Sequence, residues 1–75
     1  IHYQLPEDID VELIIYNIKG QFVKVLVNDF QNAGEHSFIW DGTDQYRNPV
    51  SSGVYLYRLK SDEGVLMSKK MLLLK

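Results

Sequence analysis

The chain has 75 residues, no cysteine and a net charge of −2, and 45% of its residues are hydrophobic. This length fits one small domain, and the lack of cysteine excludes both disulfides and thiolate metal sites. Acidic and basic residues alternate without long blocks, which argues against a partner that is nucleic acid or an anionic membrane surface. No apolar run approaches the roughly 18–20 residues of a transmembrane helix, so we expect no transmembrane segment.

Apolar residues recur with a period of two rather than 3.6, which predicts strands and no helices. The first expected strand is Ile1–Leu5, where Tyr3 follows the same alternation and Pro6 then stops the pairing. The later expected strands, which share this alternation, are Val11–Tyr16, Gln21–Asn28, Glu35–Trp40, Gly53–Lys60 and Val65–Leu74.

Turn residues separate these strands. Asn17–Gly20 is expected to form a hairpin loop in which the glycine supplies a positive φ. Asn32–Gly34 and Asp62–Gly64 are expected to turn the chain between later strands, and a longer polar loop begins at Asp41.

The expected strand Gln21–Asn28 departs from strict alternation, because its apolar parity slips between Val23 and Leu26. Such a slip predicts a β-bulge or an edge position. About seven short strands joined by turns are typical of an all-β, Ig-like antiparallel β-sandwich, and we expect residues 1–75 to form one such domain. The residues expected in its core are Trp40, Leu13, Ile15, Phe38 and Tyr57.

Catalytic chemistry has little support in the sequence. Nucleophilic catalysis needs a nucleophile beside an oriented base, and the chain has only His2 and His36. Ser37 directly follows His36 on an expected strand, so their side chains point to opposite faces. His36 shares its parity with Phe38 and Trp40, which favours a half-buried structural histidine. We therefore expect no enzyme activity and no cofactor.

Asp41 and Asp44 are the most specific candidates for a metal site, because two carboxylates in a tight loop offer oxygen ligands to Ca²⁺. Their spacing does not match an EF-hand loop. The alternative, which we favour, is that Asp41 caps the loop through an Asx-turn.

Two further side-chain groups each allow two interpretations. The tyrosines at positions 16, 55 and 57 could form a platform for a sugar, but alternating tyrosines are also ordinary filling of a sandwich. Lys69, Lys70 and Lys75 lie on the last expected strand, where lysines commonly prevent edge-to-edge aggregation and where a partner could also read them.

Several motifs in order resemble a known family across nearly the whole chain. The motifs are Ile1-x-Tyr3-x-Leu5-Pro6-Glu7, Val11-x-Leu13-x-Ile15-Tyr16-Asn17-x-x-Gly20, Gly34-x-His36-x-Phe38-x-Trp40-Asp41-Gly42-x-Asp44, Pro49-Val50-x-Ser52-Gly53-Val54-Tyr55-x-Tyr57-Arg58-Leu59 and Lys69-Lys70-Met71-x-Leu73-Leu74-Lys75. This pattern resembles the type A C-terminal sorting domain of the type IX secretion system. It is also similar to the flagellar hook-capping Ig-like domain, which shares the fold.

The resemblance implies a non-catalytic, seven-stranded sandwich that serves as an export signal. It would direct an N-terminal passenger domain in the same chain through the periplasm and outer membrane to the cell surface, with the outer-membrane secretion machinery as partner. Gly53 and Tyr55 match the family's Gly-x-Tyr motif, and Lys70 to Lys75 match its lysine-containing hydrophobic tail. The chain begins at Ile1 rather than methionine, after the upstream segment usual in the family, so we expect it to be excised from the C-terminus of a larger secreted protein.

Two alternatives of other classes remain open at the sequence level. One is an accessory Ig-like spacer or carbohydrate-binding module of a secreted multidomain enzyme, with the tyrosines as its stacking surface. The other is an assembly scaffold like the hook cap. The residues expected to matter for recognition by the export machinery are Gly53, Tyr55, Lys70 and Lys75.

Overall fold

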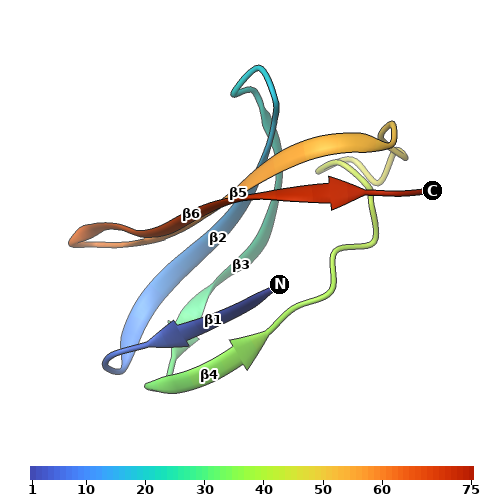
Figure 1. Ribbon diagram of the computed structural model, residues 1–75. Coiled ribbons are helices and arrows are strands. Elements are labelled where there is room, and N and C mark those ends of the chain that lie inside the picture. Colours follow the sequence, from blue (N-terminus) through green and yellow to red (C-terminus); the bar gives the residue numbers. More distant parts are fainter.

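Six strands and no helix make up the protein, and a computed structural model describes all 75 residues (Figure 1). The strands are β1 (His2–Leu5), β2 (Ile9–Asn17), β3 (Phe22–Gln31), β4 (Gly34–Ser37), β5 (Gly53–Ser61) and β6 (Gly64–Leu73). Antiparallel pairing gives a two-stranded sheet, β1-β4, and a four-stranded sheet in the order β3-β2-β5-β6. The chain has no helix that is long and apolar enough to cross a membrane.

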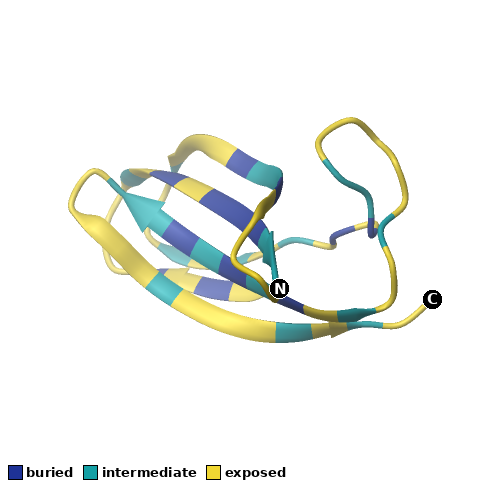
Figure 2. Cartoon of the chain, turned by 90° about the horizontal axis from the view of Figure 1, so that it is seen from above, coloured by how far each residue is buried: buried dark blue, intermediate teal, exposed yellow.

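The core lies between the two sheets, as expected for an Ig-like sandwich. On β2 and β5, apolar residues of the inner face lie directly opposite each other, including the pairs Leu13–Leu59 and Ile15–Tyr57. Tyr3 from β1 joins the same buried cluster. Figure 2 shows this burial along the central strands, while β6, the strand that leads to the C-terminus, is largely exposed. The sequence therefore predicted the fold class correctly.

The strand count is six rather than about seven, because the segment from Asp41 to Ser52 forms a loop with a single bridge, Thr43–Pro49. Most of its backbone hydrogen bonds are made within the loop rather than in a ladder. The Asp44 carboxylate, for example, accepts hydrogen bonds from the N–H groups of Tyr46 and Asn48, both at 2.9 Å.

The fourth strand is shorter than the expected Glu35–Trp40, since β4 ends at Ser37. Ile1 and Phe38 exchange the last two backbone bonds of the β1-β4 pair, at 2.8 and 2.9 Å. Beyond them the backbone has no partner strand, yet the alternation continues: Ile39 is 88% exposed and Trp40 only 7%.

Both interpretations of the parity slip in β3 are correct. The strand is an edge of the four-stranded sheet, and its register with β2 shifts twice. Ile14 pairs with Val25 and Leu13 with Val27, which leaves Leu26 as an extra residue. A second shift leaves Val23 unpaired, and its side chain turns into the core.

The hairpin between β2 and β3 also forms as predicted. Gly20 has a φ of +83°, and its N–H donates to the Asn17 carbonyl at 2.9 Å. The Asn17 side chain secures the turn, because its Oδ1 accepts hydrogen bonds from the N–H groups of Lys19 and Gln21, both at 3.0 Å.

Candidate functional site

The strand β6 carries the basic residues that the sequence singled out, and it forms the second edge of the four-stranded sheet. Its pairing with β5 fixes the direction of each side chain. Lys70 lies opposite Leu56, on the outer face, whereas Lys69 lies opposite the buried Tyr57, on the face of the core. Both lysines are exposed. One edge strand therefore presents a positive charge on each of its two faces.

The end of β6 and the segment after it are held by the loop that follows Trp40. A β-carbon placed on Gly42 would lie 3.2 Å from Cε of Lys75 and 3.4 Å from Cδ2 of Leu73, so these side chains pack closely over the glycine. The backbone N–H of Lys75 donates to Oγ of Ser52 at 3.0 Å. The last residues thus have a defined position although they lie outside any strand (Figure 1).

The start of β5 lies beside the end of β6, which brings the predicted recognition residues together. Gly53 pairs with Leu73 and Tyr55 with Met71. The Tyr55 ring is buried, and its hydroxyl donates to the Ser51 carbonyl at 2.7 Å. Tyr55 is therefore a positioning residue under this end of the sheet, inaccessible to a partner.

The backbone conformation, not lack of space, explains the glycine at position 53. The space around Gly53 is open within 4 Å, so a β-carbon would meet no neighbour. Its φ of +152° explains the residue instead, because side chains with a β-carbon rarely adopt this conformation.

Trp40 closes the end of the sandwich next to this site. Its ring meets that of Tyr55 edge-on, with centroids 5.0 Å apart and planes at 74°. Its indole N–H donates to the Thr43 carbonyl at 2.9 Å. Of the other residues expected in the core, Leu13, Ile15 and Tyr57 are buried, whereas Phe38 is half-buried and packs against the buried cluster.

Asp41 and Asp44 both act as acceptors within the loop. Oδ1 of Asp41 accepts hydrogen bonds from the Thr43 hydroxyl at 2.6 Å and from the Thr43 N–H at 3.1 Å. These bonds, with a smaller contribution from the Lys24 ammonium 3.7 Å away, lower the pKa of Asp41 below its ordinary value. No third His, Cys, Asp or Glu joins the pair as a possible metal ligand. The geometry is that of an Asx-turn.

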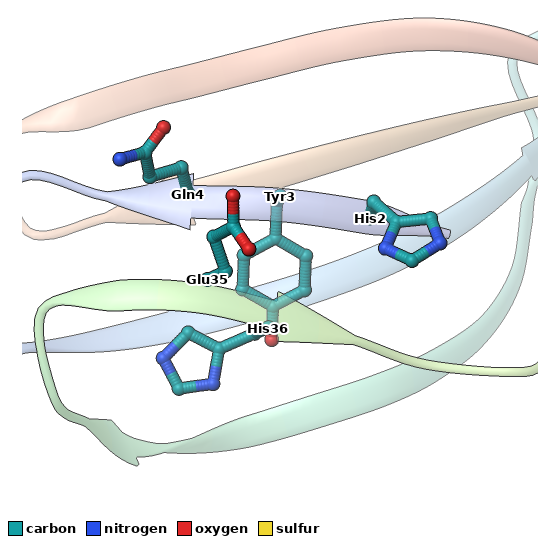
Figure 3. A pocket seen from close by; sticks show the side chains of 5 residues that line it. All are labelled: His2, Tyr3, Gln4, Glu35 and His36. Carbon is teal, nitrogen blue, oxygen red and sulfur yellow. The ribbon is translucent and has the colours of Figure 1, made fainter.

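A shallow hollow of about 340 Å³ lies over the two-stranded sheet (Figure 3). The residues that line it are His2, Tyr3, Gln4, Glu35 and His36. Two of the side chains already have partners: the Tyr3 hydroxyl donates to Oε1 of Gln31 at 2.6 Å, and Nε2 of His36 lies 2.7 Å from the Asn32 carbonyl oxygen. His36 also stacks on Tyr3, with centroids 5.5 Å apart.

The β1-β4 register creates one arrangement that the sequence did not predict. Ser37 lies opposite His2, and Glu35 lies on the same outer face. The sequence indicated only that Ser37 and His36 point apart. No hydrogen bond joins the side chains of Ser37, His2 and Glu35, all of which are exposed.

The three tyrosines do not form a common platform. Tyr55 and Tyr57 point into the core, whereas Tyr16 lies opposite Leu56 on the outer face. Arg58 covers the Tyr16 ring, with its guanidinium carbon 5.4 Å from the ring centroid. Tyr55 and Tyr57 therefore fill the sandwich, and the three rings do not share one stacking surface.

The family model of the FlgD Ig-like domain matches residues 1–64. The chain belongs to this family. The match ends at Gly64, where β6 begins, so the edge strand lies almost wholly outside the matched part of this FlgD Ig-like domain. No curated protein and no solved structure matches the chain significantly.

Proposed function

We propose that this FlgD Ig-like domain is a non-catalytic sorting signal that ends a larger secreted protein. Its passenger precedes Ile1 in the same chain, and the outer-membrane secretion machinery recognises β6 and the residues that follow it. The passenger then reaches the cell surface through the periplasm and outer membrane. The observation that supports this proposal most is an exposed basic edge strand whose register with β5 is unbroken from Met67 to Leu73.

The sandwich contributes rigidity to such a signal. Met71 and Leu73 are half-buried against the core, so the backbone that carries the residues between and beside them has a fixed position. Lys70 and Leu72 consequently project from the outer face, where Leu72 is 61% exposed. A receptor that reads charge and apolar contacts at fixed spacing needs this pre-organisation, because ordering a flexible tail on binding costs free energy.

A reporter fusion tests the proposal. The domain is placed after a periplasm-targeted reporter in a host that has the type IX machinery, and surface delivery is compared among three variants. We expect the wild type to deliver the reporter, deletion of residues 72–75 to abolish delivery, and Lys70→Ala/Lys75→Ala to reduce it severalfold. The double substitution leaves the backbone bond from Lys75 to Ser52 in place, and exposed charges contribute little to folding.

The matched control is Lys19→Ala, which removes an exposed lysine from the β2–β3 turn. It should deliver the reporter as the wild type does. Retention of the wild-type fusion in the periplasm would show that the domain is not a sorting signal. If the variant without residues 72–75 does not deliver the reporter while Lys70→Ala/Lys75→Ala delivers it fully, the tail is needed for the fold and the machinery does not recognise the lysines.

Membership of the FlgD Ig-like family favours a second candidate, an assembly scaffold like the hook cap. On this hypothesis the domain binds neighbouring subunits of a surface structure rather than a translocon. A wild-type fusion that stays in the periplasm, together with a defined complex of the purified full chain with other subunits, would support this second candidate.

A further inference from the structure

The two edges of the four-stranded sheet differ in how far they are closed. At β3, residue Gln45 of the loop takes the place of a neighbouring strand: its N–H donates to the Val23 carbonyl, and its Oε1 accepts from the Val25 N–H, both at 2.9 Å. Two bulges further disrupt this edge. Such features prevent the addition of another strand.

No loop residue covers the β6 edge, and its one bulge lies near the start of the strand. Its pairing with β5 runs without a shift from Gly53–Leu73 to Leu59–Met67, and the single irregularity lies beyond, near Leu66. In an antiparallel edge strand every second residue points its N–H and C=O groups away from the sheet. No turn or loop supplies a backbone hydrogen bond to any residue of β6. A regular row of donors and acceptors is therefore open.

The charge of β6 indicates which kind of strand could pair with this edge, a second copy of the chain or a segment of another protein. None of the ten acidic residues follows Gly64, whereas three of the eight basic residues do: Lys69, Lys70 and Lys75. A second copy that paired antiparallel through its own β6, over the full length of the strand, would bring Lys69 and Lys70 close to the same lysines of its partner. Like charges on adjacent strands are destabilising, so the edge disfavours a second copy.

We infer that β6 binds an extended acidic segment of a partner protein as a fifth strand of the sheet. Backbone hydrogen bonds to the open edge hold the segment, and adjacent carboxylates, one on each face, meet Lys69 and Lys70. An apolar side chain two positions from the carboxylate that faces Lys70 packs beside Leu72 on the outer face. This inference deepens the proposed function, on which it rests, by naming the chemistry of the segment that reads β6.

The test uses the purified domain and a capped ten-residue peptide of threonine and valine with two adjacent glutamates at its centre. In a strand, adjacent residues point to opposite faces, so one carboxylate meets each lysine. Amide hydrogen exchange and NMR titration should show slowed exchange confined to β6, with alternate residues affected most. Salt should weaken the binding.

Two variants and two control peptides separate strand addition from simple charge attraction. Lys69→Glu/Lys70→Glu should weaken binding at least about fivefold, and Lys19→Glu should leave it unchanged. A peptide with lysines in place of the glutamates should bind at least about fivefold more weakly. A peptide with prolines at alternate positions on each side of the glutamate pair keeps both carboxylates but lacks the N–H donors at those positions, and it should not slow exchange at β6.

Three results would show that the inference is wrong. The first is that the acidic peptide at millimolar concentration slows the exchange of no β6 amide, and the second is that the proline peptide binds as tightly as the acidic peptide. The third result is a dimer of the domain that pairs through β6. These results are independent of the reporter fusion. A fusion that is delivered although β6 takes no acidic strand would contradict this inference alone. An edge that binds the peptide in a domain that is not exported would contradict the sorting function alone.

Discussion

At the scale of single residues, Trp40 links the loop to the core. Its ring packs edge-on against Tyr55 while its N–H reaches the Thr43 carbonyl, so one side chain both fills the end of the sandwich and anchors the loop that holds Lys75.

Trp40→Ala should destabilise the domain by about 3–5 kcal/mol, because it leaves a large cavity. That is much of the roughly 4–11 kcal/mol expected for a chain of this length. Denaturant unfolding followed by circular dichroism measures the change. Ile39→Ala, at a neighbouring residue that is 88% exposed, is the control and should stay within about 0.5 kcal/mol of wild type. Cooperative melting of Trp40→Ala within a few degrees of wild type would refute this role.

Asp41 gives a prediction about acid stability. Its two hydrogen bonds from Thr43 lower its pKa in the folded state, so the unfolded state binds protons first as pH falls. The stabilisation is present above the ordinary aspartate pKa of about 3.9 and is lost as pH falls through the lower, folded value. Asp41→Asn should therefore be less stable than wild type at pH 7, and the difference should fade in strong acid.

The control for this pH effect is Thr43→Val, which removes the hydroxyl donor but keeps the backbone N–H. The carboxyl titration of Asp41, followed by NMR, should then shift upward toward the ordinary range. An unchanged titration in Thr43→Val would show that the hydroxyl is not the main cause.

The same loop predicts a negative result with calcium. Asp41 and Asp44 already accept hydrogen bonds from their own loop, and no third acidic side chain joins them. Calorimetry should detect no micromolar affinity for Ca²⁺. Micromolar binding that disappears in Asp44→Ala would contradict the Asx-turn interpretation.

At the scale of elements, the sequence predicted the strands well where alternation and turn residues agree. Tyr3 and Leu5 on β1 are buried as their parity indicates, and the slip in β3 between Val23 and Leu26 marks two real register shifts. The boundaries were less accurate. Whether a strand continues depends on its partner, and the last backbone bonds of this pair join Phe38 to Ile1.

The contacts around the candidate site could not be predicted in the same way. Gln45 bonds to the edge of β3, and the Lys75 side chain packs over Gly42. Both contacts join segments that are distant in sequence. The alignment of Ser37 with His2 likewise depends on a register that period-two patterns do not specify. Sequence identified the lysines of β6, but only the sheet order shows that their strand is an open edge.

Gly53→Ala tests an element-scale constraint at the start of β5. The cost should come from the φ of +152° alone, since the space around the residue is open, and we expect a loss of about 1–3 kcal/mol. Thermal unfolding measures the change, and a crystal structure of the variant should show a rotated backbone at residue 53 with no displaced neighbour. An unchanged melting temperature would mean that the backbone relaxes freely and that the glycine is not required for the fold.

At the scale of the whole molecule, the end of the family match coincides with a change in the sign of the charged residues. The FlgD Ig-like match covers residues 1–64, which contain all ten acidic residues, while the strand after it carries only basic charges. The earlier strands supply the core, and β6 contributes mainly half-buried contacts and an exposed edge. This division is the physical basis for proposing that the sandwich serves as a support and β6 as the part that is read.

The most direct test of this account is the ratio of surface to periplasmic reporter for fusions that carry Lys69→Glu/Lys70→Glu or the matched Lys19→Glu. Protease treatment of intact cells measures the surface fraction, and circular dichroism of the purified domains confirms that both variants fold. The account predicts that the β6 variant stays in the periplasm while Lys19→Glu reaches the surface like the wild type. Equal surface delivery of both folded variants would contradict it.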